Sequence, residues 1–399
     1  MMSSSRTVPF GISVLLPAFL LAGILFVSGC GKQDSHQVVR FEEDGLQVVR
    51  TEGGSRYESP LFTVEEDLVL GIDEGEPAWQ IFNQYFWFAI GPDDRIYVAD
   101  SPDNVIHLLS PSGELIKTFS RRGQGPGELT HLRLASWIED ELWLDDSNLK
   151  RVQRFTRDGE FLDIIWYGDQ MEHFGYFEQL SNTSFLGEYS IGPPTHETRF
   201  SLVDKNLKWV RDILTMPMQP MMELENGLFY PQPFTYIAGV DPYPDGRMLA
   251  FDPQAATLTV YASNGEPLFR IEREWKQIPV TAEDKQRWRA NYEDRREAYI
   301  QDMLAKAEFP AQLPPFRAAM TYDEGRAWVQ RSQALRDEQG QVMGYEFDVF
   351  DREGVWLGTQ PLALAPTLIQ NGFMYVRTRG DEFIGPRLIR YRLIPSFPG

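Results

Sequence analysis

The sequence predicts an all-β fold, a six-bladed β-propeller, and three features of the chain lead to this prediction. Short apolar runs alternate with turn signals along most of the 399 residues, and one cassette of strands recurs with constant spacing. The 32 Gly, 27 Pro and 13% aromatic residues suit many short strands joined by tight turns. A meander of about four strands in a repeat of roughly 40–50 residues is typical of a propeller blade.

The clearest copy of the cassette occupies residues 95–129. Apolar runs at 96–99, 105–109 and 115–119 predict three strands, and Ser112-Gly113 is the turn between the last two. Residues 123–127, Gly-Gln-Gly-Pro-Gly, then form a glycine-rich corner between blades. Arg121 and Arg122 beside it leave an anion site open as the alternative, although no helix or Lys-Ser/Thr pair follows, as a P-loop requires.

The spacing between the end of the first strand and the hairpin glycine identifies the repeat. It is thirteen positions from Asp100 to Gly113, and it is the same in two later copies that start at Asp146 and Asp252. Three degenerate copies bring the total to six. The residues at the equivalent position, in blade order, are Asp100, Asp146, Glu188, Asp252, Arg331 and Arg377.

These six residues are the candidate ligand-binding residues, and we call them the predicted ring. In a radial arrangement of blades, equivalent positions surround the central channel. Four acids opposed by two arginines could orient a polar or zwitterionic ligand, or part of a partner chain, by charge-assisted hydrogen bonds. The alternative is local, because an Asp at a strand end caps the next turn with its own side chain. Capping explains the three aspartates but not the two arginines.

Several stretches of the cassette resemble a known repeat. Residues 96–100 (Ile-Tyr-Val-Ala-Asp), the Ser112-Gly113 turn and residues 122–128 (Arg-Gly-Gln-Gly-Pro-Gly-Glu) are similar to the NHL-type repeat and, more closely, to bacterial six-bladed β-propeller lipoproteins. The resemblance covers residues from about 64 to 394. It implies the fold, whereas many members of such groups have no assigned activity. Propellers of this kind that are enzymes, such as lyases and lactonases, use metals or acidic residues in the channel.

The first residues predict a targeting segment. Arg6 precedes an apolar run at 10–27, and Val27-Ser-Gly-Cys30 resembles a bacterial lipobox, in which cleavage before the cysteine leaves it to be lipidated. Cys30 is the single cysteine, so no intramolecular disulfide can form. An uncleaved membrane anchor is the alternative, because the run is almost long enough to span a bilayer. Gly31 after the cysteine, by analogy with lipoprotein sorting, permits transport to the outer membrane.

We therefore expect three parts: a lipoprotein signal peptide at 1–29, the lipidated cysteine and tether at 30–44, and the propeller at 45–399. A strand within residues 46–70 should complete the last blade, whose own copy contains only about two clear strands, because such closure removes exposed sheet edges.

The charge of the chain restricts its partners. Removing Arg6 with the signal peptide leaves 37 Lys+Arg against 58 Asp+Glu, a net charge of −21. Such a protein should be repelled by nucleic acid and by anionic lipid surfaces. We therefore expect the lipid on Cys30 to hold it at the bacterial cell envelope, either facing the periplasm or at the outer membrane.

Two segments interrupt the repeats. Residues 215–233 are rich in Met and Pro, and they either form a pliable binding loop or pack across blade edges. Residues 281–308 predict an α-helical insertion between blades four and five, with a capping box at Thr281 and Asp284 and an ion pair of Glu283 with Arg287. A single helix here would extend about 40 Å, either as a lid on the outside of these blades or as one wall of a pocket.

Motifs for catalysis are sparse. The five histidines show no HxH or HExxH spacing, and no GxSxG elbow is present. No cofactor is expected, although a divalent metal such as calcium among Asp100, Asp145 and Asp146 is left open. The sequence thus favours a lipid-anchored binding module for a small polar ligand or an envelope protein. A metal-dependent hydrolase or lyase in the channel is the alternative, and a purely structural envelope component is a third interpretation.

Overall fold

The computed structural model describes residues 36–397 except 73–76, 81, 83–85, 101–102, 169–173, 182–183, 192–195, 323–324 and 381–384. The predicted signal peptide and Cys30 lie outside these residues. Residues Ser35–Gly399 form one compact unit. In the described part of the chain, no helix combines the length and the apolar character that a membrane span requires.

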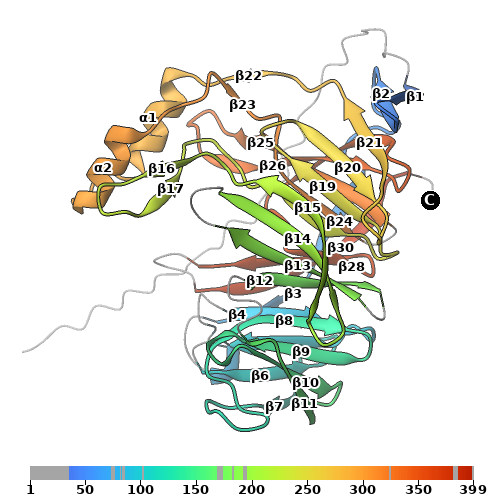
Figure 1. The fold of residues 1–399 in the computed structure, drawn as a ribbon, viewed down its shortest axis with the longest axis vertical. Helices are drawn as coiled ribbons and strands as arrows, with labels where there is room; N and C mark the ends of the chain where they lie inside the picture. The colour runs from blue at the N-terminus through green and yellow to red at the C-terminus, as the bar shows by residue number, and fades with distance from the viewer. Residues whose placement is uncertain are drawn as a thin grey trace, which may run out of the picture. The chain divides into compact units, whose positions relative to one another are not determined.

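The compact unit is a six-bladed β-propeller (Figure 1). Blade one contains β4 (Phe86–Ile90), β5 (Ile96–Asp100), β6 (Val105–Leu109) and β7 (Leu115–Phe119). Blade two contains β8 (Leu132–Ile138), β9 (Glu141–Asp146), β10 (Arg151–Thr156) and β11 (Phe161–Trp166), with the 3-10 turn η2 (Ser147–Leu149) between β9 and β10. Blade three contains β12 (Phe174–Ser181), β13 (Ser184–Ile191), β14 (Glu197–Asp204) and β15 (Trp209–Pro217).

The second half of the propeller continues the pattern. Blade four contains β18 (Gly239–Pro242), β19 (Met248–Asp252), β20 (Thr257–Tyr261) and β21 (Pro267–Arg273). Blade five contains β24 (Phe316–Tyr322), β25 (Arg326–Arg336), β26 (Val342–Phe350) and β27 (Trp356–Leu362). Blade six contains β28 (Leu368–Gln370), β29 (Phe373–Thr378) and β30 (Arg387–Pro395). Strands within each blade pair in chain order, as expected for a meander.

An N-terminal strand closes the propeller. β3 (Phe62–Leu70) pairs antiparallel with β30 and supplies the fourth strand of blade six, which confirms the prediction of a closing strand within residues 46–70. The 3-10 turn η1 (Ala78–Gln80) then leads toward blade one. Because β3 belongs to the start of the chain and β30 to its end, closure ties the first and last blades together.

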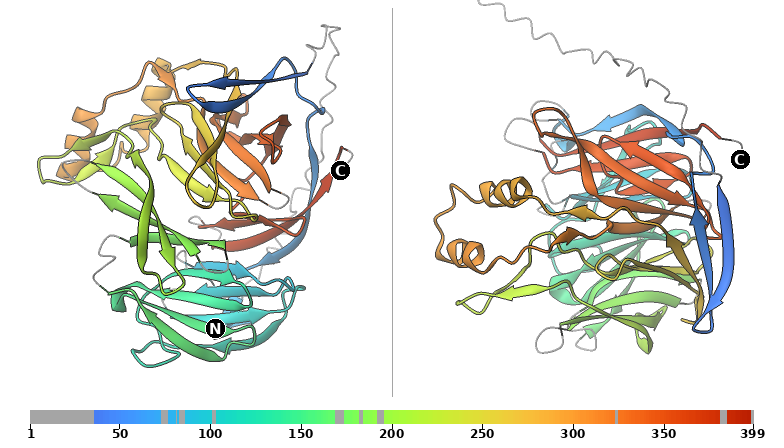
Figure 2. Two further views of the ribbon diagram at one scale, coloured as in Figure 1. Left: turned by 45° about the vertical axis from the view of Figure 1, so that its right-hand side comes forward. Right: turned by 90° about the horizontal axis from the view of Figure 1, so that it is seen from above.

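A second N-terminal element extends blade four. β1 (Gln37–Glu43) and β2 (Leu46–Glu52) form a hairpin around Asp44-Gly45, and β2 runs parallel to β21 (Figure 2). The hairpin begins inside the stretch 30–44 that we assign to the tether. Thr51 of β2 and the residues that follow it lie along the outer strand of blade five. There the backbone N–H of Trp356 donates to Thr51 Oγ1 at 3.1 Å, and the backbone N–H of Tyr57 donates to the Leu357 carbonyl at 2.9 Å. The N-terminal segment therefore fastens blades four, five and six.

The hairpin glycines explain why the repeat keeps its spacing. Gly159 has a φ of 73°, and a Cβ added to it would lie 2.5 Å from the Phe119 ring on the outer strand of blade one. A Cβ added to Gly113 would similarly lie 2.9 Å from the Leu68 side chain, and one added to Gly265 would lie 2.9 Å from the Ile213 side chain. Each of these turns thus packs on the outer strand of the preceding blade. The repeat needs glycine both for the backbone conformation and for this close approach.

Replacing Gly159 with alanine is therefore expected to lower the free energy of unfolding by about 2 kcal/mol, from backbone strain plus displacement of Phe119. The matched control is Gly45→Ala, because Gly45 has a similar φ of 78° and nothing within 4 Å of the added Cβ. That variant should cost only about 1 kcal/mol. Urea unfolding of both variants measures the difference, and equal costs would show that the contact between blades adds nothing.

The insertion between blades four and five contains two helices, so the prediction of one continuous helix is wrong. α1 (Ala282–Ala290) and α2 (Ala298–Lys306) are separated by a polar stretch with too few apolar side chains to hold a helix on a core. The capping box of Thr281 with Asp284 is confirmed, as is the ion pair of Glu283 with Arg287 at 2.7 Å. The short strands β22 (Ile278–Pro279) and β23 (Gln312–Leu313) pair at the base of the insertion.

The insertion packs on the Met- and Pro-rich connection. Here β16 (Met221–Glu223) and β17 (Phe229–Pro231) form a hairpin, and Met222 is buried with Ile300 and Met303 of α2. The Lys306 ammonium donates to the Glu223 carbonyl at 2.9 Å. Met216 instead is buried in the core cluster that contains Phe200 and Met248, from blades three and four. The helices thus share a small core with this hairpin.

Candidate functional site

The predicted ring residues occupy equivalent places on the second strands of their blades. Phe86 pairs with Asp100, Leu132 with Asp146, and Phe316 with Arg331. Each candidate thus lies at the end of the blade where the first strand begins. Equivalence is confirmed, but all six lie on the second strands, one strand away from the strands that line the channel. Their contacts also differ from blade to blade.

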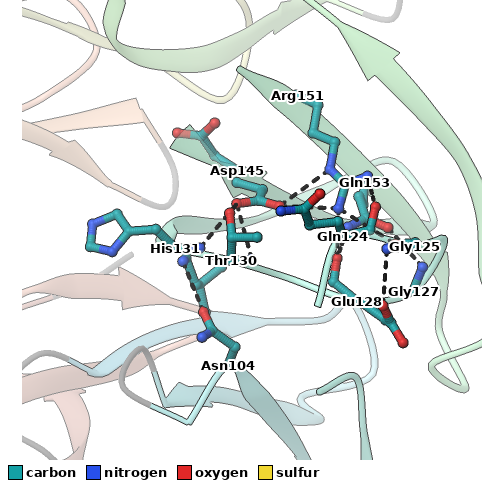
Figure 3. A network of polar contacts seen from close by, with 12 residues as sticks. Asn104, Gln124, Gly125, Gly127, Glu128, Thr130, His131, Asp145, Arg151 and Gln153 are labelled. Carbon is teal, nitrogen blue, oxygen red and sulfur yellow. Dashed lines mark hydrogen bonds and ion pairs between the residues drawn. The ribbon is translucent and has the colours of Figure 1, made fainter. Parts of the chain in front are cut away.

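Asp146 belongs to a buried network inside blade two, and its partners Thr130, His131 and Arg151 are labelled in Figure 3. Its Oδ1 accepts hydrogen bonds from the N–H groups of Thr130 and His131 at 3.2 and 3.0 Å, and from the Thr130 hydroxyl at 2.5 Å. Its Oδ2 accepts from Nε of Arg151 at 3.2 Å. Both Asp146 (0%) and Arg151 (1%) are almost without exposure to solvent. The carboxylate is therefore fully used within the protein, and a ligand would have to displace these donors.

Arg151 and the neighbouring Gln153 hold the glycine-rich corner. Arg151 donates to the carbonyls of Gln124 at 2.9 Å and Glu128 at 2.8 Å, and Gln153 accepts from the Gly127 N–H at 2.8 Å. The Glu128 carboxylate accepts from the Gly125 N–H and then from Arg121, and these bonds lower the pKa of Glu128. These contacts favour the prediction of a corner between blades over an anion site at Arg121.

The remaining candidates also have local surroundings. Asp252 accepts from the N–H groups of Gln254 and Ala255, which is the local turn cap named as the alternative. Arg331 donates to buried Asp348 at 2.9 and 2.8 Å and to Glu346 at 2.9 Å. Asp100 is buried, and Glu188 is half-buried with a pKa raised by desolvation.

A cavity of about 760 Å³ occupies the central channel, and we call it the central cavity. It is lined by the first strands of all six blades, β4, β8, β12, β18, β24 and β28. Of the predicted ring, Arg377 lines it. Among the described lining residues, Asp241 and Arg377 carry charge. Aromatic side chains make up much of the rest of its wall: Trp87, Phe88, Trp137, Tyr243 and Tyr322.

Asp241 is held in the central cavity by the neighbouring blade. Its Oδ2 accepts from the Thr321 N–H at 2.6 Å and from the Thr321 hydroxyl at 2.8 Å. Desolvation raises the pKa of Asp241 to about 6, against the opposing effect of these two hydrogen bonds. The carboxyl group is thus poised to change its charge near neutral pH.

Arg377 stands at the end of the cavity where the first strands begin. Its Nη1 donates to the Phe86 carbonyl at 2.6 Å, and its guanidinium lies 4.6 Å from the centre of the Trp87 ring. Burial, with a contribution from Arg379, lowers its pKa. The remaining guanidinium N–H groups can serve a polar ligand.

No group of three or more His, Cys, Asp or Glu side chains that could hold a metal occurs within the part of the chain that the structure describes. Asp145, one of the residues considered for calcium, accepts instead from Arg133 at 2.6 Å and from the Tyr167 hydroxyl at 2.9 Å. Its burial raises its pKa.

The register shows what the sequence reasoning missed. The first strand of each blade pairs with the residue three before each ring candidate, for example Asp241 with Leu249 and Met320 with Trp328. The six first-strand residues at this level all line the cavity: Ala89, Ser136, Gln179, Asp241, Met320 and Ile369. Counting back three residues and across one strand would have found Asp241.

No protein-family model matches the chain, and no curated protein matches its sequence. Among solved structures, a member of the DUF4221 family from Bacteroides vulgatus is similar at 9% identity and TM-score 0.48, over 84% of this chain and 99% of that one. A gluconolactonase from Xanthomonas campestris is similar at 10% identity and TM-score 0.43, over 82% and 98% of the two chains. A virginiamycin B lyase from Staphylococcus aureus is similar at 8% identity and TM-score 0.40, over 84% of this chain and 100% of that one.

Proposed function

We propose that the protein is a lipid-anchored, extracytoplasmic binding module that takes a small polar ligand in its central cavity. The observation that carries the proposal is the cavity itself, which combines an aromatic wall with two opposite charges, Asp241 and Arg377. Binding sites of small molecules are commonly concave and apolar, with a few polar groups that fix the orientation of the ligand.

The two large insertions support recognition at one end of the channel. The helices precede β24, and the β16–β17 hairpin precedes β18, so both leave the propeller where the first strands begin. This is also the end at which Arg377 lines the cavity. Figure 2 shows the helices and the hairpin projecting on the same side. If the partner is a protein of the cell envelope instead of a small molecule, we expect it to contact this face.

The anchor rests on the sequence alone. Val27-Ser-Gly-Cys30 precedes a short polar tether, and the first described strand begins at Gln37. The net charge of −20 gives the protein surface no general attraction to anionic lipid, so a lipid on Cys30 would supply the attachment.

One native mass spectrometry measurement tests both parts. The protein expressed from its full sequence and extracted from membranes in detergent should lack residues 1–29, carry a lipid modification on Cys30 and retain a small molecule. Cys30→Ser should abolish the modification. Arg377→Met should lose the small molecule, whereas Arg392→Met, which removes an exposed arginine on β30, should keep it.

An intact N-terminal segment would refute the anchor. A cavity that stays empty after incubation with a mixture of polar metabolites, or a ligand that Arg377→Met retains, would refute the channel site.

The alternative, a hydrolase or lyase in the same channel, is favoured by one observation, the raised pKa of Asp241, which suits a proton-transfer group. Its metal-dependent form predicts a stoichiometric metal. Metal analysis of the purified protein, with thermal melting before and after chelation, tests this form.

A further inference from the structure

The hydrogen bonding of Asp241 is asymmetric. Both hydrogen bonds from Thr321 go to Oδ2. Oδ1 accepts no hydrogen bond from the residues that the structure describes, and Asp241 forms no ion pair with them. A carboxylate in a desolvated site normally gains partners for both oxygens, since an unpaired charge there is costly. One oxygen of Asp241 is thus left for a ligand.

The charge of Asp241 is not compensated from the other side of the cavity. Arg377, the other charged residue in the described lining, is stacked on Trp87 and bound to the Phe86 carbonyl of blade one. Asp241 instead belongs to blade four and is bound to blade five through Thr321. The two charges therefore do not neutralise each other, and a cation on a ligand would compensate the charge of Asp241.

The composition of the lining indicates which kind of cation. Hard metal ions take six or more oxygen ligands, several of them carboxylates, and Asp241 is the single carboxylate in the described lining. An ammonium group needs fewer acceptors, and Ser136 and Gln370 add neutral oxygens to the lining. The aromatic residues Trp137 and Tyr322 in the lining suit the apolar part of an organic amine.

We propose that the ligand of the central cavity carries an organic ammonium group, which donates a hydrogen bond to Oδ1 of Asp241, with Thr321 fixing the carboxylate. This inference rests on the proposed function and names the chemical class of its ligand. An additional anionic group on the same ligand would be recognised by the guanidinium of Arg377. The net charge of −20 attracts such cations toward the protein.

Three probes that share a phenyl ring on a two-carbon chain and differ in charge test the inference: phenethylamine, its neutral N-acetyl derivative and 3-phenylpropionate. Titration of the full-length protein in detergent, followed by tryptophan fluorescence, should show the amine binding at least about tenfold more tightly than either analogue, a difference of about 1.4 kcal/mol. Asp241→Asn should remove this preference, because the amide keeps an acceptor for Thr321 but loses the charge. Asp252→Asn removes the same charge from blade four at a turn outside the cavity, so it should leave the preference unchanged.

Each outcome decides a different statement. If all three probes bind with equal affinity, or if Asp241→Asn retains the preference for the amine, the cationic ligand is refuted while the channel site stands. If no probe binds at millimolar concentration and the native protein contains no small molecule, both the inference and the channel site are refuted. Circular dichroism of Asp241→Asn separates lost binding from lost folding.

Discussion

Replacing Arg151 with methionine is expected to lower the free energy of unfolding by about 3–5 kcal/mol, which is the cost of leaving a buried charge without its partner. Arg151 is 1% exposed and Asp146 is 0% exposed. The substitution leaves Oδ2 of Asp146 without this cation. It also removes a donor to the carbonyls of Gln124 and Glu128, of which the second still accepts from Gln153.

The matched control lies on the same strand. Arg154 of β10 pairs with Asp163 at 2.6 Å in a partly exposed ion pair, so Arg154→Met should cost no more than about 1 kcal/mol. The double variant Arg151→Met with Asp146→Asn removes both charges and should recover part of the loss, because the remaining amide still accepts from Thr130.

Urea unfolding of the native protein, Arg151→Met, Asp146→Asn, their double variant and Arg154→Met measures these free energies and the coupling between positions 151 and 146. A cost for Arg151→Met no larger than that of Arg154→Met would mean that the network does not stabilise the fold. If Arg151→Met keeps the native stability but no longer binds the ligand, Asp146 and its network would again be candidates for binding.

The fold could be predicted from the sequence because its strongest constraints are local. Gly113, Gly159 and Gly265 are each required by a turn with positive φ and by contact with the preceding blade, so the spacing survives in the sequence. Closure could be predicted because the last repeat lacked strands. The parallel pairing of β2 with β21 could not, since a short alternating run indicates a strand but not its neighbour.

The site was harder to predict because the most regular signal was structural. Asp146 and Asp252 recur at one position for local reasons, a buried network in one blade and a turn cap in the other. The residues that line the channel differ from blade to blade, because each blade contributes one side chain at a given level and the repeat does not require the same residue there. Asp241, within the turn-like sequence Gly-Val-Asp-Pro, gives no repeat signal at all.

The second large effect is a pH-dependent loss of folding stability caused by Asp241. Its pKa is about 6 in the folded protein against a reference value of 3.8. The folded state therefore binds more protons than the unfolded state between these values, and stability falls as pH rises through this window. Ionised Asp241 should cost about 2–3 kcal/mol above pH 7, from roughly two pKa units at 1.36 kcal/mol each. Asp241→Asn should thus gain this much stability over the native protein at pH 7.5 and gain nothing near pH 4.

The groups around Asp241 keep this interpretation simple. Tyr243 and Tyr322 face it, and burial raises the pKa of both, so they remain neutral throughout the window. Arg377 remains charged. Urea unfolding at several pH values should therefore show a stability difference between the native protein and Asp241→Asn that grows from about pH 4 to about pH 6 and is constant above it. Asp252→Asn, at an exposed turn, should show a difference within about 0.5 kcal/mol at every pH.

A gain in stability from Asp241→Asn would also bear on function. A protein that keeps an ionised carboxylate in a desolvated cavity loses stability that a single substitution could restore, and such residues are typically retained at binding sites. A saturating amine should then narrow the gap at pH 7.5, since it stabilises the native protein but not the variant. If the gap is absent without ligand, or if the amine leaves it unchanged, Asp241 is a structural residue of the interface between blades four and five.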